Sequence, residues 1–127
     1  MSKNYKPTVA IDFDGVIHSY TSGWQGVDEC PDPMVPGIDT AIADLRTDHK
    51  VIVVSSRAAT PEGRIAIRDY LKKYNIEVDG IQNEKPPCIV SIDDRAICFT
   101  GYSDILAKQV REFKPWYSKN EESEKSE

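Results

Sequence analysis

Five short apolar runs, separated in part by longer segments of helical periodicity, constrain most strongly what this chain can fold into. The runs are residues 9–11, 51–54, 78–81, 89–92 and 97–99. The second and fourth are continuous and rich in β-branched side chains, which is typical of strands covered on both faces. Strands that alternate with helices predict a parallel sheet joined by right-handed crossovers.

Three segments have the pattern of amphipathic helices. Residues 37–49 carry apolar side chains at i, i+3, i+4 and i+7. Residues 60–74 open with Thr60 as a candidate N-cap and Pro61 at the first helical position, and residues 103–113 start from Ser103. The side chains expected to face the core are Ile38, Ala41, Ile42 and Leu45, then Ile67, Tyr70, Leu71 and Tyr74, then Leu106, Val110 and Phe113. The predicted fold is α/β, a three-layer Rossmann-like sandwich with a mostly parallel five-stranded sheet.

The length and composition favour one domain. We expect it to span residues 1–117 of the 127, followed by a disordered charged tail at 118–127. No apolar run approaches the ~20 residues of a membrane helix, and the N-terminus has no apolar leader segment. Three cysteines without a C-x-x-C pair favour reduced thiols over disulfides or a zinc site. We therefore expect a cytoplasmic protein with no membrane partner.

The formal net charge of −5 limits the kinds of molecule that we expect this chain to bind. Extended nucleic-acid binding depends on many phosphate contacts with basic side chains, so we do not expect it here. Binding of a single phosphate group at the end of a strand stays possible. The sequence says nothing about the oligomeric state.

Polar side chains follow three of the apolar runs and precede one of them. Because ligands bind beyond the carboxyl ends of parallel strands, these side chains are expected to meet at one edge of the sheet. They are Asp12 and Asp14 after the first run, Ser55, Ser56 and Arg57 after the second, Lys85 before the fourth, and Asp93, Asp94 and Arg95 after the fourth.

Four carboxylates near one point would repel one another unless cations compensate them. Lys85 is one such cation, and a divalent metal is the other that the pattern implies. Oxygen ligands with access to water suit Mg²⁺. Together with serine and arginine, such a site is suited to a tetrahedral dianion, of which phosphate is the obvious example.

The segments AIDFDGV, VIVVSSR, EKPP and VSIDDR, in this order between residues 10 and 95, resemble the four motifs of the haloacid-dehalogenase-like phosphohydrolases. The resemblance implies an Mg²⁺-dependent phosphomonoesterase that works through an aspartyl phosphate. By the same resemblance, Asp12 would be the nucleophile, Asp14 the general acid and base, Ser55 a phosphate ligand, and Lys85 the residue that holds Asp12 and the developing charge. Asp94 would bind the metal, with Asp93 beside it, the Asp12 carboxylate and the Asp14 backbone carbonyl. Ser56, Arg57 and Arg95 are candidates for substrate binding.

The resemblance also narrows the reaction. Members that cleave carbon–halogen bonds lack an acid at the position of Asp14, so a phosphatase or phosphomutase is implied. No large cap domain fits between the motifs, which favours a phosphatase with an open site. The sequence is similar to the phosphatase half of polynucleotide kinase-phosphatases and to small stand-alone bacterial and phage proteins of the same superfamily. The substrate is then a phosphorylated small molecule or a phosphorylated polymer end, such as a nucleic-acid 3′-phosphate.

Other interpretations of the same motifs fit less well. The glycine spacing does not match an EF-hand loop, and the phosphate-binding loop of nucleotide triphosphatases is absent. A receiver domain would not carry the D-x-D of residues 12–14. A non-catalytic phosphate-binding or regulatory domain stays open as the alternative function. Arg57 and Arg95 could equally pair with acidic neighbours, Trp24 and His18 lie on a loop near the site, and Arg64, Arg68 and Lys72 form a basic stripe that is more often a solvated helix face.

Overall fold

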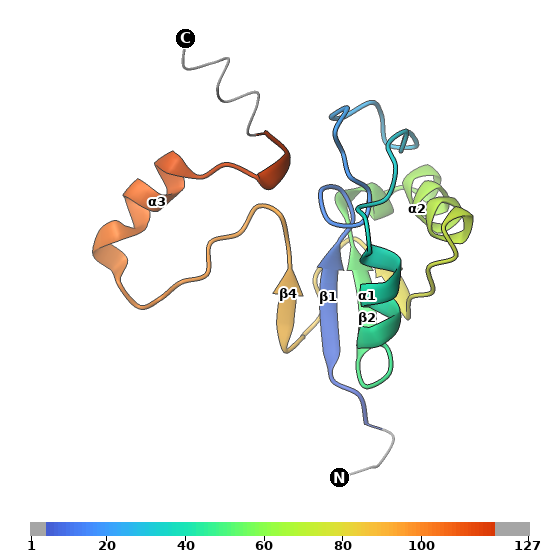
Figure 1. Ribbon diagram of the computed structural model, residues 1–127, viewed down its shortest axis with the longest axis horizontal. Coiled ribbons are helices and arrows are strands. Elements are labelled where there is room, and N and C mark those ends of the chain that lie inside the picture. The colour runs from blue at the N-terminus through green and yellow to red at the C-terminus, as the bar shows by residue number, and fades with distance from the viewer. Residues whose placement is uncertain (1–4, 119–127) are drawn as a thin grey trace.

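A computed structural model describes residues 5–118. Its centre is one sheet of four parallel strands: β1 (Thr8–Asp12), β2 (Lys50–Val54), β3 (Gly80–Gln82) and β4 (Val90–Ile92). The order across the sheet is β3-β2-β1-β4 (Figure 1). The predicted α/β class with a parallel sheet is confirmed. The prediction of a fifth strand at residues 97–99 is wrong, because these residues form no strand.

The helices begin near the predicted positions. They are α1 (Ile38–Leu45), α2 (Pro61–Lys73) and α3 (Leu106–Glu112), with short 3₁₀ helices η1 (Ser56–Ala59), η2 (Ser103–Ile105) and η3 (Trp116–Ser118). Thr60 is the N-cap of α2, where its side chain accepts a hydrogen bond from the Gly63 backbone N–H at 3.1 Å. No helix in residues 5–118 has the length and apolar character needed to cross a membrane.

The core lies between the sheet and the pair α1 and α2. The chain steps from β1 to β2 to β3 in one direction, so right-handed crossovers place both helices on the same face. The buried side chains there are Ile11, Phe13, Ile17, Ile42, Val51, Val53, Ala58, Ile67, Tyr70, Leu71 and Ile76. The step from β3 back to β4 reverses direction, which carries residues 83–89 across the opposite face. This crossing brings Lys85 towards the site.

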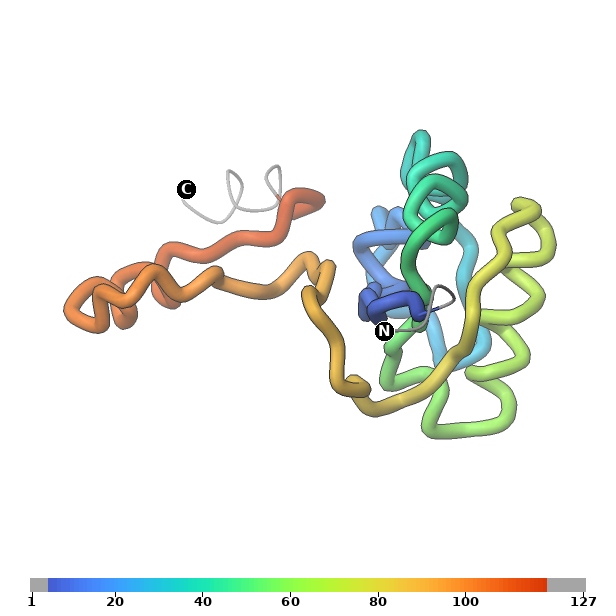
Figure 2. The backbone as a smooth tube through the Cα atoms, turned by 90° about the horizontal axis from the view of Figure 1, so that it is seen from below, coloured from blue at the N-terminus to red at the C-terminus, as the bar shows by residue number. Residues whose placement is uncertain are grey.

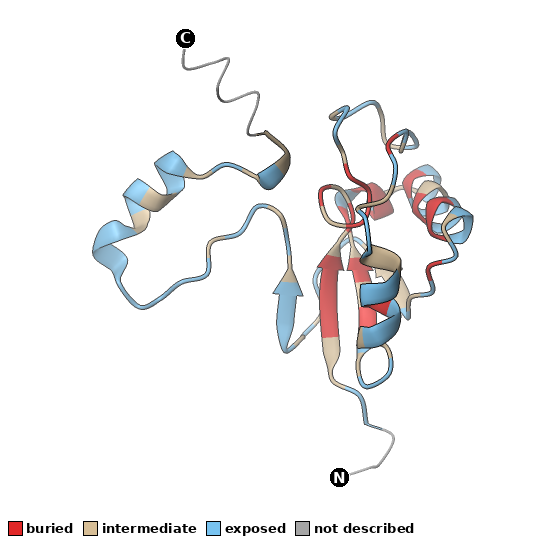
Figure 3. Ribbon diagram, in the orientation of Figure 1, coloured by how far each residue is buried: buried red, intermediate tan, exposed pale blue. Residues whose placement is uncertain are grey.

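The third layer expected from residues 103–113 does not form in the described part of the chain. The segment 96–113, called the arm below, extends away from the sheet in both views, and α3 has no buried residue (Figures 1 and 2). Val110 is 63% exposed, so its predicted burial is wrong, while Leu106 and Phe113 are half-buried. Figure 3 shows the same contrast between the exposed arm and the buried central strands. Of the tail expected at residues 118–127, Ser118 is described as the last residue of η3, and residues 119–127 lie outside the described part of the chain.

Candidate functional site

The carboxyl ends of β1 and β4 bring three carboxylates together. The two strands are neighbours in register, with Ile11 opposite Ile92, so Asp12 and Asp93 leave the sheet side by side. One oxygen each of Asp12, Asp93 and Asp94 lies within 4.8 Å of the others. This is the cluster that the sequence predicts at the edge of the sheet.

Two hollows adjoin this cluster. The larger, about 340 Å³, is lined by Ala10, Ile11, Asp12, Val54, Ser55, Ser56, Lys85, Ser91 and Asp93. The smaller, about 160 Å³, is lined by Asp12, Asp14, Tyr20, Ser55, Ser56, Asp94, Arg95 and Tyr117. Asp12, Ser55 and Ser56 line both hollows. The structure therefore brings together eight of the nine predicted site residues.

The environment of the Asp12 carboxyl disfavours its ionised form. Burial is the main cause that raises its pKa to about 8, and a hydrogen bond with Asp94 adds to it. Two neighbouring carboxylates can share a proton or a cation, and either would relieve the repulsion. Carboxylate oxygens are the donors that Mg²⁺ prefers, and of the three residues Asp93 is exposed to solvent. The residues present thus fit a hard divalent cation.

Ser55 follows β2 directly and is buried, with 6% of its surface exposed. Its Oγ accepts a hydrogen bond from the Arg57 backbone N–H at 3.2 Å, which caps η1. The hydroxyl proton of the same side chain is still available to a group in either hollow. Ser55 therefore serves both as a cap and as a wall of the site, whereas Ser56 is exposed.

Asp14 is held by side chains from two directions. Arg57 donates to it through Nε at 2.8 Å and Nη2 at 3.1 Å, and His18 Nδ1 lies 2.8 Å from its Oδ1. Burial alone would raise the pKa of Asp14, but the hydrogen bonds from His18 and Arg57 outweigh it and hold the pKa below its ordinary value. The carboxylate is thus fixed in place and kept ionised.

The tautomer of His18 follows from its other partner. His18 is fully buried, and its Nε2 accepts a hydrogen bond from the Asp32 backbone N–H at 3.1 Å. Nε2 therefore carries no proton, so in the neutral ring Nδ1 is protonated and donates to Asp14. The Asp32 carbonyl in turn accepts from the Tyr70 hydroxyl at 2.9 Å. This chain links the loop after β1 to helix α2.

Arg57 lies beneath the site and not within either hollow. It is 1% exposed, and Nη1 donates to the carbonyls of Gly26 and Val27, each at 2.8 Å. The ring of Trp24 covers the guanidinium, with 4.6 Å between Cζ and the ring centroid. This position favours support of Asp14 over the substrate contact expected from the sequence. Trp24 packs on Arg57 here, although half of its own surface is exposed.

Two aromatic residues from the end of the described chain cover the site. Trp116 Nε1 donates to the Gly15 carbonyl at 2.7 Å, and the Tyr117 hydroxyl donates to Asp94 Oδ2 at 2.7 Å. Arg95 Nε donates to the same hydroxyl at 3.1 Å. Burial, followed by the Asp94 hydrogen bond, raises the pKa of Tyr117 to about 12, so the hydroxyl stays protonated. We call residues 115–118 the strap.

Sequence reasoning assigned no role to His18, Asp32, Trp116 or Tyr117. A Trp-Tyr pair directly after a proline is a weak signal of a segment that docks, but it does not say where. Gly15, in the loop after β1, is the residue against which the strap packs. Its φ is +88°, and a Cβ there would collide with the Asp94 carboxylate and the Tyr117 ring. The glycine that follows D-x-D is thus required by space as well as by backbone conformation.

Comparisons with known proteins add little beyond this geometry. No family model and no curated protein sequence matches the chain. A chain in the solved structure of a Pnkp1/Rnl/Hen1 complex has a TM-score of 0.48 and 18% sequence identity. The alignment covers 91% of this chain and 37% of that one. Similarity at this level carries no argument about function.

Proposed function

We propose that this chain is an Mg²⁺-dependent phosphomonoesterase that works through an aspartyl-phosphate intermediate. The observation that carries the proposal is the meeting of Asp12, Asp93 and Asp94 within 4.8 Å, next to hollows walled by Ser55 and Lys85. Such a site combines a nucleophile, cation ligands, a hydroxyl donor and a fixed positive charge. These are the groups that phosphoryl transfer requires.

The reaction would proceed in two displacements. An Asp12 oxygen forms a bond to phosphorus while the bond from phosphorus to the leaving alcohol oxygen breaks, and that oxygen takes a proton from the Asp14 carboxyl, which recovers one from water in the second step. Water then attacks the phosphorus, the bond to Asp12 breaks, and inorganic phosphate leaves. Ser55 and Lys85 would donate to the phosphoryl oxygens as negative charge builds on them.

The metal would be held by Asp12, Asp93 and Asp94. When bound, it would supply positive charge against the phosphoryl oxygens and the clustered carboxylates. Lys85, which lines the larger hollow with Asp12, would add a second positive charge. The strap hydroxyl of Tyr117 would keep the Asp94 carboxylate oriented.

Asp14 is the proposed proton carrier. Three hydrogen-bond donors on its carboxylate keep it ionised, which is the form that accepts a proton from the attacking water, although they also make it a weaker base. The same contacts leave it less suited to deliver a proton to the leaving group. These hydrogen bonds to Asp14 therefore favour a second candidate function, that of a non-catalytic domain that binds phosphate.

The size of the hollows bears on the substrate class. Pockets that enclose a whole small molecule usually measure about 300–1,000 Å³. Here the hollows measure about 340 and 160 Å³, so the larger lies at the lower end of this range. Both of the expected substrate classes therefore fit, a small phosphoester and a phosphate at the end of a larger molecule, of which a nucleic-acid 3′-phosphate is one example.

The first test is hydrolysis of para-nitrophenyl phosphate with Mg²⁺ and with EDTA. We expect turnover with Mg²⁺ only, and a loss of more than about 10³-fold in Asp12→Asn, because the nucleophile is removed. Asp69→Asn is the matched control, since Asp69 is two-thirds exposed on α2 and the chemical change is identical. A 3′-phosphorylated oligonucleotide and a panel of small phosphoesters would then separate the substrate classes.

The two candidate functions differ in a second measurement. A chain that forms an adduct with BeF₃⁻ and Mg²⁺, lost in Asp12→Asn, but hydrolyses none of these esters would fit a very selective enzyme, because the adduct needs an intact Asp12 site. A chain that binds inorganic phosphate but forms no adduct would fit the non-catalytic domain. A chain that shows no hydrolysis, no adduct and no binding of phosphate would contradict both candidates.

A further inference from the structure

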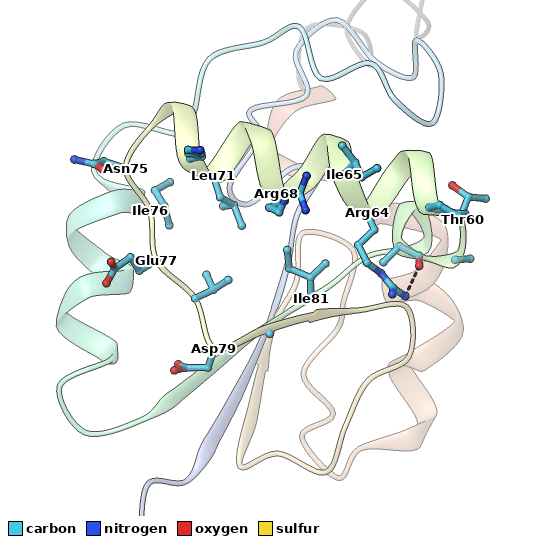
Figure 4. A pocket seen from close by; sticks show the side chains of 16 residues that line it. Thr60, Arg64, Ile65, Arg68, Leu71, Asn75, Ile76, Glu77, Asp79 and Ile81 are labelled. Atoms are coloured by element: carbon cyan, nitrogen blue, oxygen red, sulfur yellow. Dashed lines mark hydrogen bonds between the residues drawn. The ribbon is translucent and has the colours of Figure 1, made fainter.

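A further hollow lies away from the acidic cluster, between α2 and the edge strand β3 (Figure 4). Its volume is about 880 Å³, and we call it the α2/β3 groove. It is lined by Ala58, Ala59, Thr60, Pro61, Arg64, Ile65, Arg68, Leu71, Lys72, Asn75, Ile76, Glu77, Val78, Asp79, Gly80 and Ile81. None of the candidate catalytic residues belongs to it, so a ligand of the groove would be independent of the proposed function.

One wall of the groove is basic. Arg64, Arg68 and Lys72 follow one another at intervals of four residues along α2 and are all exposed. Arg64 Nη2 donates to the Ala58 carbonyl at 3.0 Å, which holds the guanidinium over the groove (Figure 4). In the described part of the chain, the one carboxylate within 4 Å of these three cations is Asp69, at 3.8 Å from Arg68. In a chain of net charge −5, this wall is a local excess of positive charge.

The acidic side chains at the far end of the groove do not neutralise that wall. Glu77 and Asp79 are instead bound by Arg46, at 3.2 and 2.9 Å. The floor is apolar, formed by Leu71 and Ile76, with Ile81 rising from β3 towards the helix (Figure 4). Ile65 on the helix is 47% exposed at the rim. The groove thus joins an apolar floor to unneutralised cations.

The other wall is a strand edge. β3 pairs with β2 alone among the described strands, so its outer edge can accept a further strand. Side chains on one face of a strand repeat about every 6.6 Å, close to the rise of about 6 Å between Arg64, Arg68 and Lys72. A strand laid beside β3 would therefore present every second side chain to one of these cations.

We propose that the α2/β3 groove binds an extended acidic peptide, which adds to the sheet at β3 and carries carboxylates at alternate positions. Backbone hydrogen bonds to the strand edge would supply affinity, and the cations would select the acidic sequence. A single-stranded nucleic acid is less well matched. Its binding relies on aromatic stacking, and no residue lining the groove is aromatic.

The test uses the whole chain and three fluorescein-labelled probes. They are an octapeptide in which glutamate alternates with threonine, the same peptide with lysine in place of glutamate, and oligothymidylate of eight nucleotides. We expect saturable binding of the glutamate peptide alone, measured by fluorescence anisotropy, and weaker binding as salt is raised. In ¹⁵N-labelled protein, the amides of residues 64–82 should shift and those of residues 12–15 should not.

Two variants on the same helix make the matched comparison. Arg68→Glu should weaken the binding of the glutamate peptide roughly tenfold or more, because it replaces an attraction with a repulsion in the groove. Lys73→Glu makes the same kind of charge reversal on a residue outside the groove, where Lys73 lies over the Tyr74 ring, and should change binding less than about twofold. N-methylation of alternate peptide amides should also abolish binding if the peptide joins the sheet.

Several results would overturn the proposal. The first is that the glutamate peptide shows no saturable binding. The second is that Arg68→Glu and Lys73→Glu weaken its binding equally. The third is that the amide shifts are confined to residues outside the groove. If oligothymidylate binds more tightly than the peptide and shifts the same amides, the ligand of the groove is a nucleic acid and not a peptide. Circular dichroism of each variant would show that the comparison is made between folded chains.

Discussion

At the scale of single residues, Gly15 is the point in the loop after β1 where the strap makes contact. Its positive φ and the proximity of Asp94 and Tyr117 leave no room for a Cβ. In Gly15→Ala we expect the Asp94 carboxylate and the strap to be displaced. The proposed hydrolase activity should fall by at least about 100-fold, because displacements of about 1 Å at a reacting site have effects of this size. The measurement is turnover of para-nitrophenyl phosphate.

Gly23→Ala is the control for that substitution. Gly23 also has a positive φ, +74°, but no atom lies within 4 Å of a Cβ built there. Both substitutions carry the backbone cost of a left-handed alanine, about 1 kcal/mol. Gly23→Ala should therefore lose only this amount of stability, less than Gly15→Ala, while retaining activity. Equal loss of activity in the two variants would show that strain, and not the collision, is responsible.

The sequence predicts residues whose role depends on a strand end, and misses residues whose role depends on tertiary contact. Asp12, Asp93 and Asp94 lie at one edge, as predicted, because they come at the carboxyl ends of neighbouring strands. The contacts of Tyr117 with Asp94 and of Trp116 with Gly15 join positions 23 and 101 residues apart, and no local pattern encodes them. Arg57 shows a further limit, since its residue type does not reveal whether it faces solvent or a buried carboxylate.

At the scale of elements, Arg46 and Asp79 join the end of α1 to the start of β3. Arg46 donates to Asp79 through Nε at 3.1 Å and Nη2 at 2.9 Å, and the Val51 backbone N–H donates to Asp79 at 2.8 Å. The Arg46 hydrogen bonds are the main cause that holds the pKa of Asp79 below its ordinary value of 3.8, against the effect of burial. Asp79 therefore stabilises the fold in its ionised form.

A pH-dependent loss of stability follows from this lowered pKa. The carboxylate contributes fully above pH 3.8, and its contribution is lost as the pH falls through the lower pKa of the folded state. Asp79→Asn should lower the free energy of unfolding at pH 7 by a modest amount, because solvent screens the pair with Arg46 while the hydrogen bond from the Val51 N–H is partly buried. The difference from the parent chain should shrink below about pH 4. Urea unfolding at several pH values measures both.

Glu77→Gln serves as the control on the same arginine. Glu77 lies 3.2 Å from Arg46 but its side chain is 87% exposed, and exposed pairs contribute about 0–1 kcal/mol. We expect little change in stability at any pH. A loss as large as that of Asp79→Asn would mean that the net charge near Arg46, and not the hydrogen bonds of Asp79, carries the effect.

The predicted elements succeed where a hydrophobic pattern coincides with burial. Helix α2 has a cap at Thr60 and an inward face at Ile67, Tyr70 and Leu71, and both were evident from the spacing. Residues 97–99 have the composition of a strand, but strand formation needs a neighbour to pair with. Here the chain leaves β4 and runs out along the arm, so the apolar side chain of Phe99 is 59% exposed.

At the scale of the whole molecule, the arm and the sheet should differ in local stability. Helix α3 has seven residues, no capping side chain and no buried residue, and helices shorter than about 12 residues are marginal without tertiary packing. Hydrogen exchange should therefore be fast in residues 106–112 and slowest in β1 and β2. Mass spectrometry of the labelled chain measures both regions at once.

A result in which the amides of 106–112 are as protected as those of β1 would contradict this expectation. It would imply that the exposed side chains of the arm, among them Tyr102, Ile105 and Val110, are covered in solution. A dependence of the protection on protein concentration would then identify a second copy of the chain as the cover.

The contacts of the strap also fix an order of events during synthesis. Every strand of the sheet and all three clustered carboxylates leave the ribosome before Trp116 and Tyr117, which close over Gly15 and Asp94. Because N-terminal parts of a nascent chain can fold first, the sheet can form while the carboxylates still lack their aromatic cover. A chain that stops at residue 114 would therefore end as a folded sheet with an acidic, uncovered edge, one that differs from the finished protein in how readily cations reach it.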